Sequence, residues 1–194
     1  MKATSSIEWL AFLFGIVQVL LALKNKVVNF YAGIISVSFY IYVFYIYGLF
    51  AESLLNIYYL IVSITGLFLW QSKNALPISK SNQSDYLKAL ILGLISLGIL
   101  YFVLTKFTSS NVPFLDAFVT SSAWVGTWLL IKRKLENWIV LNISNLVAIP
   151  LQFYKGLELT SLLTCIYFII AIQGYFTWQK LMKVELESTQ KIKI

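Results

Sequence analysis

The chain has 194 residues, of which 59% are hydrophobic and 12% charged, and its mean hydropathy is +0.80. Soluble domains are about 45–50% apolar and about 25% charged, so the composition excludes an ordinary water-soluble domain. With no histidine and one cysteine, histidine-based metal sites, Ser–His pairs and a disulfide framework are excluded. We therefore expect no metal and no cofactor. We also expect no nucleic-acid partner, because in a membrane protein the distribution of the +7 net charge between the loops matters more than its sum.

Seven apolar stretches lie between charged or turn-rich breaks. A spanning helix needs about 20 mostly apolar residues, with a range of about 17–25. The stretches are residues 7–23, 30–50, 54–71, 86–105, 114–131, 137–154 and 159–179. The longest break, 72–85, is rich in Ser, Asn and Lys, contains Pro77, and has the composition of a linker. The sequence therefore predicts an all-α membrane protein with seven transmembrane helices.

The positive charges gather on one side of this predicted topology. Because Lys and Arg mark cytoplasmic loops, we expect the N-terminus outside and the C-terminus in the cytoplasm. Lys24 and Lys26 follow the first stretch and only Lys2 precedes it, which favours a retained helix over a cleaved signal peptide. The cytoplasmic side would hold 12 of the 15 basic residues, namely Lys24, Lys26, Lys73, Lys80, Lys88, Lys132, Arg133, Lys134, Lys180, Lys183, Lys191 and Lys193.

The chain contains an internal repeat. When residue 24 is aligned with residue 132 and the rest follow without a gap, identical polar, glycine and aromatic residues coincide. They are Lys24, Lys26, Asn29, Tyr59, Gly66, Trp70 and Gln71 on Lys132, Lys134, Asn137, Tyr167, Gly174, Trp178 and Gln179. The alignment predicts two three-helix repeats, 7–71 and 114–179, with a linker and connecting helix over 72–105 and a cytoplasmic tail over 180–194. The fourth helix restores the orientation, so the repeats would be parallel in a 3+1+3 arrangement.

Charged residues are absent from the middle of every predicted span. Intramembrane ionisable groups mark proton relays and ion-coupled pumps, so their absence favours passive transport, with an ion-coupled transporter on the same scaffold as the alternative. The spans also contain no paired carboxylates and no nucleophile–base pair, and we therefore expect no enzymatic activity.

The candidate site is a polar stripe on the sixth span. Its members stand at i, i+4, i+7 and i+14, which places them on one helix face. An unpartnered amide costs several kcal/mol in hydrocarbon, so the stripe must face protein or a water-filled cavity, whether as a ligand site or as glue between helices. The stripe is Trp138, Asn142, Asn145 and Gln152, whereas the aligned first-repeat residues are Phe30, Ile34, Val37 and Phe44. Other spans would complete a single site with Gln18, Asn56, Tyr59 and Trp124.

Several of these motifs resemble the PnuC family of bacterial nicotinamide riboside transporters, over essentially the whole chain. The resemblance rests on residues 132–138, on 154–157 with Thr160, on Gly174 with Trp178, and on Asn56, Tyr59, Gly66 and Trp70. It implies a 3+1+3 fold like that of the SWEET sugar transporters and a homotrimer in the bacterial inner membrane, in contact with membrane lipid. It also implies facilitated diffusion of a vitamin that a cytoplasmic kinase then traps by phosphorylation.

One position departs from the family pattern. Family members that carry nicotinamide riboside typically have a second tryptophan three residues after the first, followed by an acidic or amide residue, whereas this chain has Leu141 and then Asn145. Nicotinamide riboside and thiamine are both flat aromatic cations with hydroxyl groups, and each cation–π contact contributes about 0.5–2 kcal/mol. The sequence therefore predicts a facilitator for one of these two vitamins.

Overall fold

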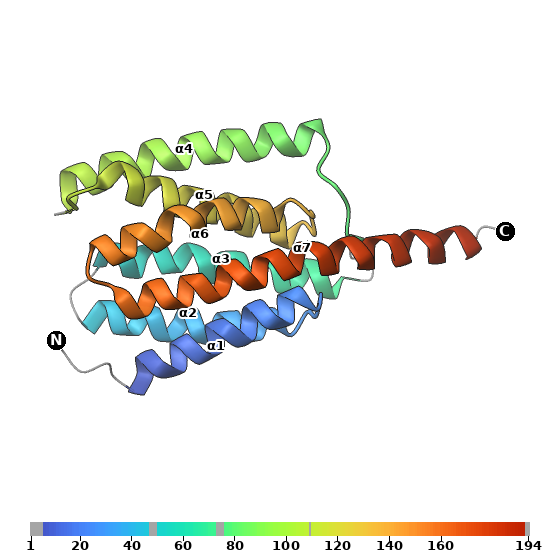
Figure 1. Cartoon of the computed structure of the whole chain (residues 1–194), viewed down its shortest axis with the longest axis horizontal. Helices are drawn as coiled ribbons and strands as arrows, with labels where there is room; N and C mark the ends of the chain where they lie inside the picture. Colours follow the sequence, from blue (N-terminus) through green and yellow to red (C-terminus); the bar gives the residue numbers. More distant parts are fainter. Residues whose placement is uncertain (1–5, 47–49, 73–75, 109, 193–194) are drawn as a thin grey trace. The chain divides into compact units, whose positions relative to one another are not determined.

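The computed structural model describes residues 6–46, 50–72, 76–108 and 110–192, and within them it forms seven α-helices (Figure 1). The chain divides into two compact units, Met1–Leu76 and Pro77–Ile194. The first unit holds α1 (Ser6–Leu23), α2 (Asn29–Ile46) and α3 (Phe50–Gln71). The second holds α4 (Gln83–Phe107), α5 (Pro113–Ile131), α6 (Asn137–Tyr154) and α7 (Glu158–Ile192).

Each predicted stretch corresponds to one helix, and most of the bounds shift by a few residues. The stretch over 30–50 divides, because α2 ends at Ile46 and residue 50 already belongs to α3; residues 47–49 lie outside the described part, as do Lys2, Lys73 and Lys193 of the charge pattern. The helix expected to end at residue 179 continues as α7 to Ile192 (Figure 1). Residues 180–192 contain no Gly or Pro and are rich in Lys, Glu and Leu, which are good helix formers.

Five of the helices are long and apolar enough to cross a membrane. They are α1, α2, α4, α5 and the Thr160–Ser188 part of α7. The apolar part of α3, Leu55–Gln71, is shorter than these five helices. Helix α6 is continuous, but the amide side chains of the stripe interrupt its apolar sequence. Spans at α3 and α6 therefore stay predictions. At about 1.5 Å per residue, the 35 residues of α7 exceed the hydrocarbon core of about 30 Å.

Within the first unit, α2 contacts both α1 and α3. The Ser36 hydroxyl donates to the Ala11 carbonyl of α1 at 2.7 Å. The Ser53 hydroxyl of α3 donates to the Ile41 carbonyl of α2 at 3.2 Å. The rings of Phe30 and Trp70 meet edge to face, with centroids 5.0 Å apart and an interplanar angle of 89°. These contacts are among those that join the three helices.

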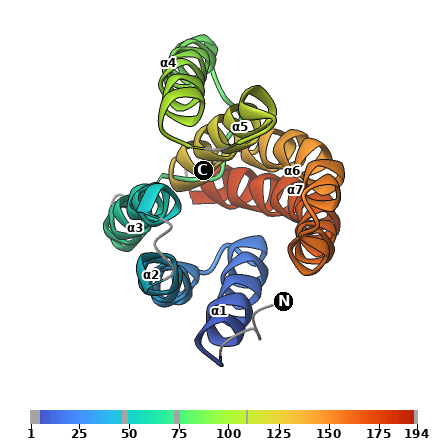
Figure 2. The same cartoon turned by 90° about the vertical axis from the view of Figure 1, so that its left-hand side faces the viewer.

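The second unit repeats these contacts at the aligned positions. Its α6 contacts α5 and α7 as α2 contacts α1 and α3, while α4 packs against α5 at the edge of the unit (Figure 2). The recurring contacts are Ser144 to the Val119 carbonyl at 2.8 Å, Ser161 to the Ile149 carbonyl at 3.0 Å, and Trp138 to Trp178 with centroids 5.5 Å apart at 89°. The sequence repeat is therefore also a repeat of contacts.

Gly174 of α7 offers a direct stability test because it lies against the aromatic pair. A Cβ at Gly174 would stand 2.6–2.7 Å from atoms of the Trp138 ring, whereas nothing lies within 4 Å of a Cβ at Gly98 of α4. We expect Gly174→Ala to destabilise the protein by about 1–3 kcal/mol through overpacking. Gly98→Ala should be neutral or stabilising by up to about 1 kcal/mol, because alanine favours helix.

Thermal unfolding of both variants in the same detergent checks this prediction. Equal melting temperatures for Gly174→Ala and Gly98→Ala would show that the close approach of α6 and α7 at Gly174 is unimportant for stability.

Candidate functional site

The polar stripe of α6 runs along the border between two faces of the helix. On one face Ser144, Ala148 and Leu151 are buried. On the opposite face the apolar side chains are exposed, and they include Ile139, Ile143 and Leu146. Between these faces lie Asn142, Asn145 and Gln152, which are half-buried. The amides are thus at the edge of the packed interface rather than at its centre.

A groove of about 310 Å³ lies between α6 and α7, within the size range of ligand pockets. Its polar lining comes from Trp138, Asn142 and Tyr175. The apolar lining is Ile139, Ile143, Leu146, Phe168, Ala171, Ile172 and Phe176. The lining contains no charged side chain, so a ligand here would be held by aromatic rings, amides and apolar contact.

Tyr175 is a lining residue that the sequence reasoning missed. It lies on α7, one residue after Gly174, and is half-buried. The repeat alignment carried a signal for it, because the aligned first-repeat residue is Leu67. The replacement of an apolar residue by a polar aromatic one is the same asymmetry that marks the stripe on α6.

Trp138 forms the end of the groove and is 2% exposed. The α7 residues Trp178 and Gly174 cover part of its ring. Its indole Nε1 is buried and has no hydrogen-bond partner among the described residues. A buried donor without a partner costs about 1–3 kcal/mol, and such groups are normally satisfied by protein or ordered water. The N–H is therefore a group of Trp138 that packing leaves unused, while stacking of its ring on a ligand stays a prediction.

The three amides of the stripe differ in their partners. The Gln152 Oε1 accepts a hydrogen bond from the Thr164 hydroxyl of α7 at 2.8 Å, which joins two helices. The Asn145 Nδ2 donates to the Asn142 Oδ1 at 3.5 Å, at the outer limit for such a bond. Gln152 thus serves helix packing in this structure, whereas Asn142 and Asn145 keep hydrogen-bonding capacity at the groove.

Gln18 and Leu141 each pack against a glycine of a neighbouring helix. A Cβ on Gly33 of α2 would lie 2.8 Å from the Gln18 side chain of α1, and a Cβ on Gly126 of α5 would lie 2.7 Å from the Leu141 side chain of α6. In the repeat alignment Gln18 matches Gly126 and Gly33 matches Leu141. The large residue is therefore on the first helix of the first repeat and on the second helix of the second repeat, and the glycine is on the other helix in each case. Leu141 therefore packs against α5 and does not line the groove between α6 and α7.

The remaining predicted residues lie apart from this groove's lining. Gln18, Asn56 and Tyr59 belong to the Met1–Leu76 unit, where Asn56 and Tyr59 are half-buried on α3. Trp124 is half-buried on α5 of the second unit. Of the eight predicted residues, the structure brings Trp138 and Asn142 into one groove, with Asn145 beside Asn142. No metal-binding cluster of His, Cys, Asp and Glu occurs in the described parts of the chain.

The apolar helices and the uncharged groove define a helical multi-pass membrane protein. A family model described as nicotinamide mononucleotide transporter matches residues 5–180. The chain therefore belongs to this family of membrane transporters, rather than to a family of enzymes.

Named relatives confirm the resemblance to the PnuC family. The chain is 30% identical over 184 residues to the nicotinamide riboside transporter PnuC of Neisseria mucosa, covering 87% of this chain and 70% of that protein. It is 22% identical to PnuC of Escherichia coli, with 90% and 85% covered. A solved structure titled as the crystal structure of the vitamin B3 transporter PnuC matches with a TM-score of 0.74 and 26% identity, over 94% of this chain and 84% of that one.

The Trp138 ring can be tested separately from its N–H. Phe30 makes the aligned edge-to-face contact with Trp70 in the first unit, so a phenyl ring suffices for this packing. We expect Trp138→Phe to change the free energy of unfolding by less than about 1.5 kcal/mol, because the lost ring volume is offset by removal of an unpaired buried N–H. Trp138→Ala should cost about 3–5 kcal/mol. Equal losses in thermal or chemical unfolding of the two variants would contradict this account.

Proposed function

We propose that this chain imports a water-soluble vitamin of the nicotinamide riboside type across the bacterial inner membrane. The observation that carries the proposal is the uncharged groove between α6 and α7, in which Trp138, Tyr175 and Asn142 come together. Relatives across most of the chain are named nicotinamide riboside transporters. The groove chemistry suits a flat aromatic cation with hydroxyl groups, which describes nicotinamide riboside and also thiamine.

We propose facilitated diffusion as the mode of transport, and the same chemistry supports it. A cation–π contact contributes about 0.5–2 kcal/mol, and a hydrogen bond adds about 0.5–1.5 kcal/mol. These contacts allow binding without a buried carboxylate, which would hold a cation too firmly for easy release. We propose that a cytoplasmic kinase then phosphorylates the vitamin and maintains the inward gradient.

We propose that the transporter has the 3+1+3 arrangement of helices. The recurring contacts within α1–α3 and α5–α7 support two equivalent three-helix repeats, 7–71 and 114–179. The positive charges support an outer N-terminus and a cytoplasmic C-terminus. We also propose that Gln18, Asn56, Tyr59 and Trp124 contribute to the substrate site, together with Asn145 and Gln152. The family resemblance supports a homotrimer.

Purified protein in proteoliposomes tests the proposal directly. We expect labelled nicotinamide riboside, or labelled thiamine, to equilibrate faster than in empty vesicles and to stop at the outside concentration. Vesicles that equilibrate neither compound faster than empty ones would contradict vitamin transport. Accumulation above the outside concentration that an ionophore abolishes would instead establish the ion-coupled alternative.

Asn142 offers a test of the groove itself. We expect Asn142→Leu to raise the half-saturation concentration for uptake about three- to tenfold, because one hydrogen bond of about 0.5–1.5 kcal/mol is lost. Ile34→Leu is the matched control, since residue 34 aligns with residue 142 in the first repeat and receives the same side chain. Unfolding temperatures of both variants should stay near that of the unmodified protein. Unchanged uptake by a folded Asn142→Leu variant would remove Asn142 from the site.

A further inference from the structure

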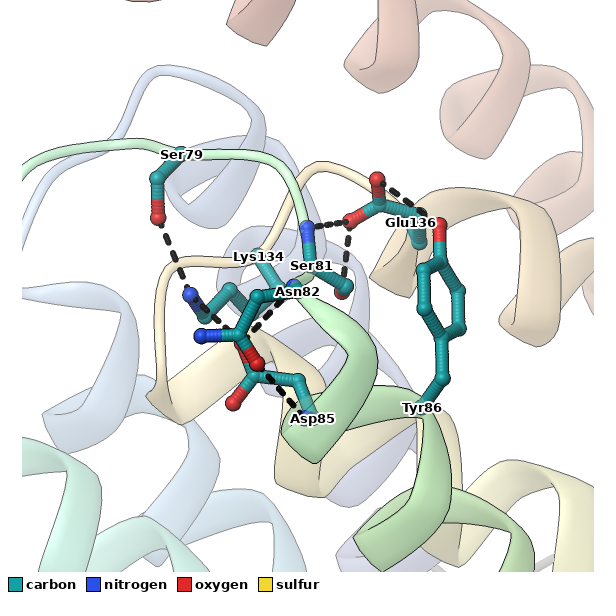
Figure 3. Close-up of polar contacts among 7 residues, drawn as sticks. All are labelled: Ser79, Ser81, Asn82, Asp85, Tyr86, Lys134 and Glu136. Carbon is teal, nitrogen blue, oxygen red and sulfur yellow. Dashed lines mark hydrogen bonds and ion pairs between the residues drawn. The ribbon is translucent and has the colours of Figure 1, made fainter.

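Residues 77–82, which precede α4, form a strap across the turn between α5 and α6 (Figure 3). The Ser79 backbone N–H donates to the Arg133 carbonyl at 3.1 Å, and the Leu135 N–H donates to the Ser79 carbonyl at 2.9 Å. Ile78 is 3% exposed. The Lys134 Nζ donates to the Ser79 hydroxyl at 3.2 Å. The strap is therefore fixed by both backbone and side-chain contacts.

Glu136 adds the contacts that tie the strap to the start of α6. Its Oε2 accepts hydrogen bonds from the Ser81 N–H at 2.9 Å and the Ser81 hydroxyl at 2.7 Å, and Figure 3 shows this carboxylate between Ser81 and Tyr86. Glu136 directly precedes α6 in the N-cap position, yet its side chain makes no capping bond to that helix. The carboxylate is thus directed to the strap. The first turn of α6 that follows carries Trp138, and Asn142 lies one turn further on.

The same strap holds α7, which forms the other wall of the groove. The Ile78 N–H donates to the Glu185 Oε2 at 3.0 Å, and Glu185 lies in the part of α7 beyond residue 179. Burial lowers the pKa of the nearby Arg133, and the charge of Glu185 opposes this shift. The carboxylates of Glu136, at the start of α6, and of Glu185, on α7, therefore both accept hydrogen bonds from the strap.

The first repeat supplies an internal comparison for Glu136. Its turn has the same backbone shape, because Asn25 and the aligned Arg133 have φ values of 53° and 52°. The residue aligned with Glu136 is Val28, which is exposed. The turn therefore forms without a carboxylate at this position, and the carboxylate of Glu136 serves the strap rather than the turn.

We propose that Glu136 is a positioning residue for the groove. By fixing the start of α6 to the strap that also holds α7, Glu136 sets the spacing between the two walls that carry Trp138 and Tyr175. The identity of the ligand rests on the proposed function, whereas the spacing of the walls is a property of the fold that can be measured without a ligand.

The first test is the uptake kinetics of Glu136→Val, which installs the residue of the other repeat. We expect the KM for the transported vitamin to rise about three- to tenfold while the maximal rate per folded protein stays within about twofold. Glu136→Gln keeps an acceptor oxygen for Ser81 and should recover most of the affinity. Glu187→Val, at an exposed position of α7, removes the same charge and should leave the KM unchanged.

The Tyr86 hydroxyl of α4 also donates to the Glu136 Oε1 at 3.4 Å, and a double-mutant cycle tests whether Glu136 acts through Ser81. Ser81→Ala should raise the KM in the same direction as Glu136→Val, and the double variant should match Glu136→Val rather than add to it, because contacting residues are not independent. If Glu136→Val does not fold, Ser81→Ala and Glu136→Gln carry the comparison. An unchanged KM in every folded strap variant, or full additivity, would overturn the positioning role.

A ligand-free measurement separates this inference from the proposed function. Spin labels at positions 139 and 176, on opposite walls of the groove, should give a narrow distance distribution in a Cys165→Ala background. We expect Glu136→Val to broaden or shift it, and Glu187→Val to leave it unchanged. Identical distributions in both variants would overturn the inference even where vitamin transport is established. A shift in Glu136→Val without any vitamin transport would uphold the inference and reject the function.

Discussion

The fold depends on one constraint, which is that polar groups of a membrane helix must find partners inside the protein because hydrocarbon offers none. Ser36 of α2 and Ser144 of α6 meet this constraint by donating to the carbonyls of Ala11 and Val119 on the neighbouring helices. Ser53 of α3 and Ser161 of α7 donate in the same way to carbonyls of α2 and α6. Each bond places two helix backbones close together at a defined register. The same pattern in both units therefore builds two three-helix sets with the same internal packing.

Equivalent packing makes the differences between the repeats informative. Phe30 and Trp138 make the same contact with a tryptophan, so the added indole N–H is not required for packing. Asn142 stands where the first repeat has Ile34, and Glu136 stands where it has Val28. Three departures on one helix and its preceding turn place polar groups at the groove and at the strap. The second repeat thus carries polar groups at positions where the aligned face of the first repeat is apolar.

The sequence predicted most of the fold because apolar length and repeat spacing are local or periodic signals. Helix α6, expected over 137–154, has those bounds, and Trp138 and Asn142 do share a groove. The role of Gln152 could not be read from its helix position, because its partner Thr164 comes from α7. Composition marked residues 72–85 as a linker and gave no sign that Ser79 and Ser81 bind the α5–α6 turn, since this pairing depends on tertiary contact.

The helical part of α7 beyond residue 179 links the membrane region to the strap. A tail without regular structure would place Glu185 at no defined distance from α6, whereas a continuous helix transmits its position from Trp178 to Glu185. Trp178 packs against Trp138, which lines the groove, and the Glu185 carboxylate accepts a hydrogen bond from the Ile78 N–H of the strap. The walls are therefore joined at two levels, by an aromatic pair in the apolar region and by carboxylates at the polar end. The groove itself has no charged lining residue. The carboxylates of Glu136 and Glu185, which lie outside the apolar region, can therefore hold its two walls in place.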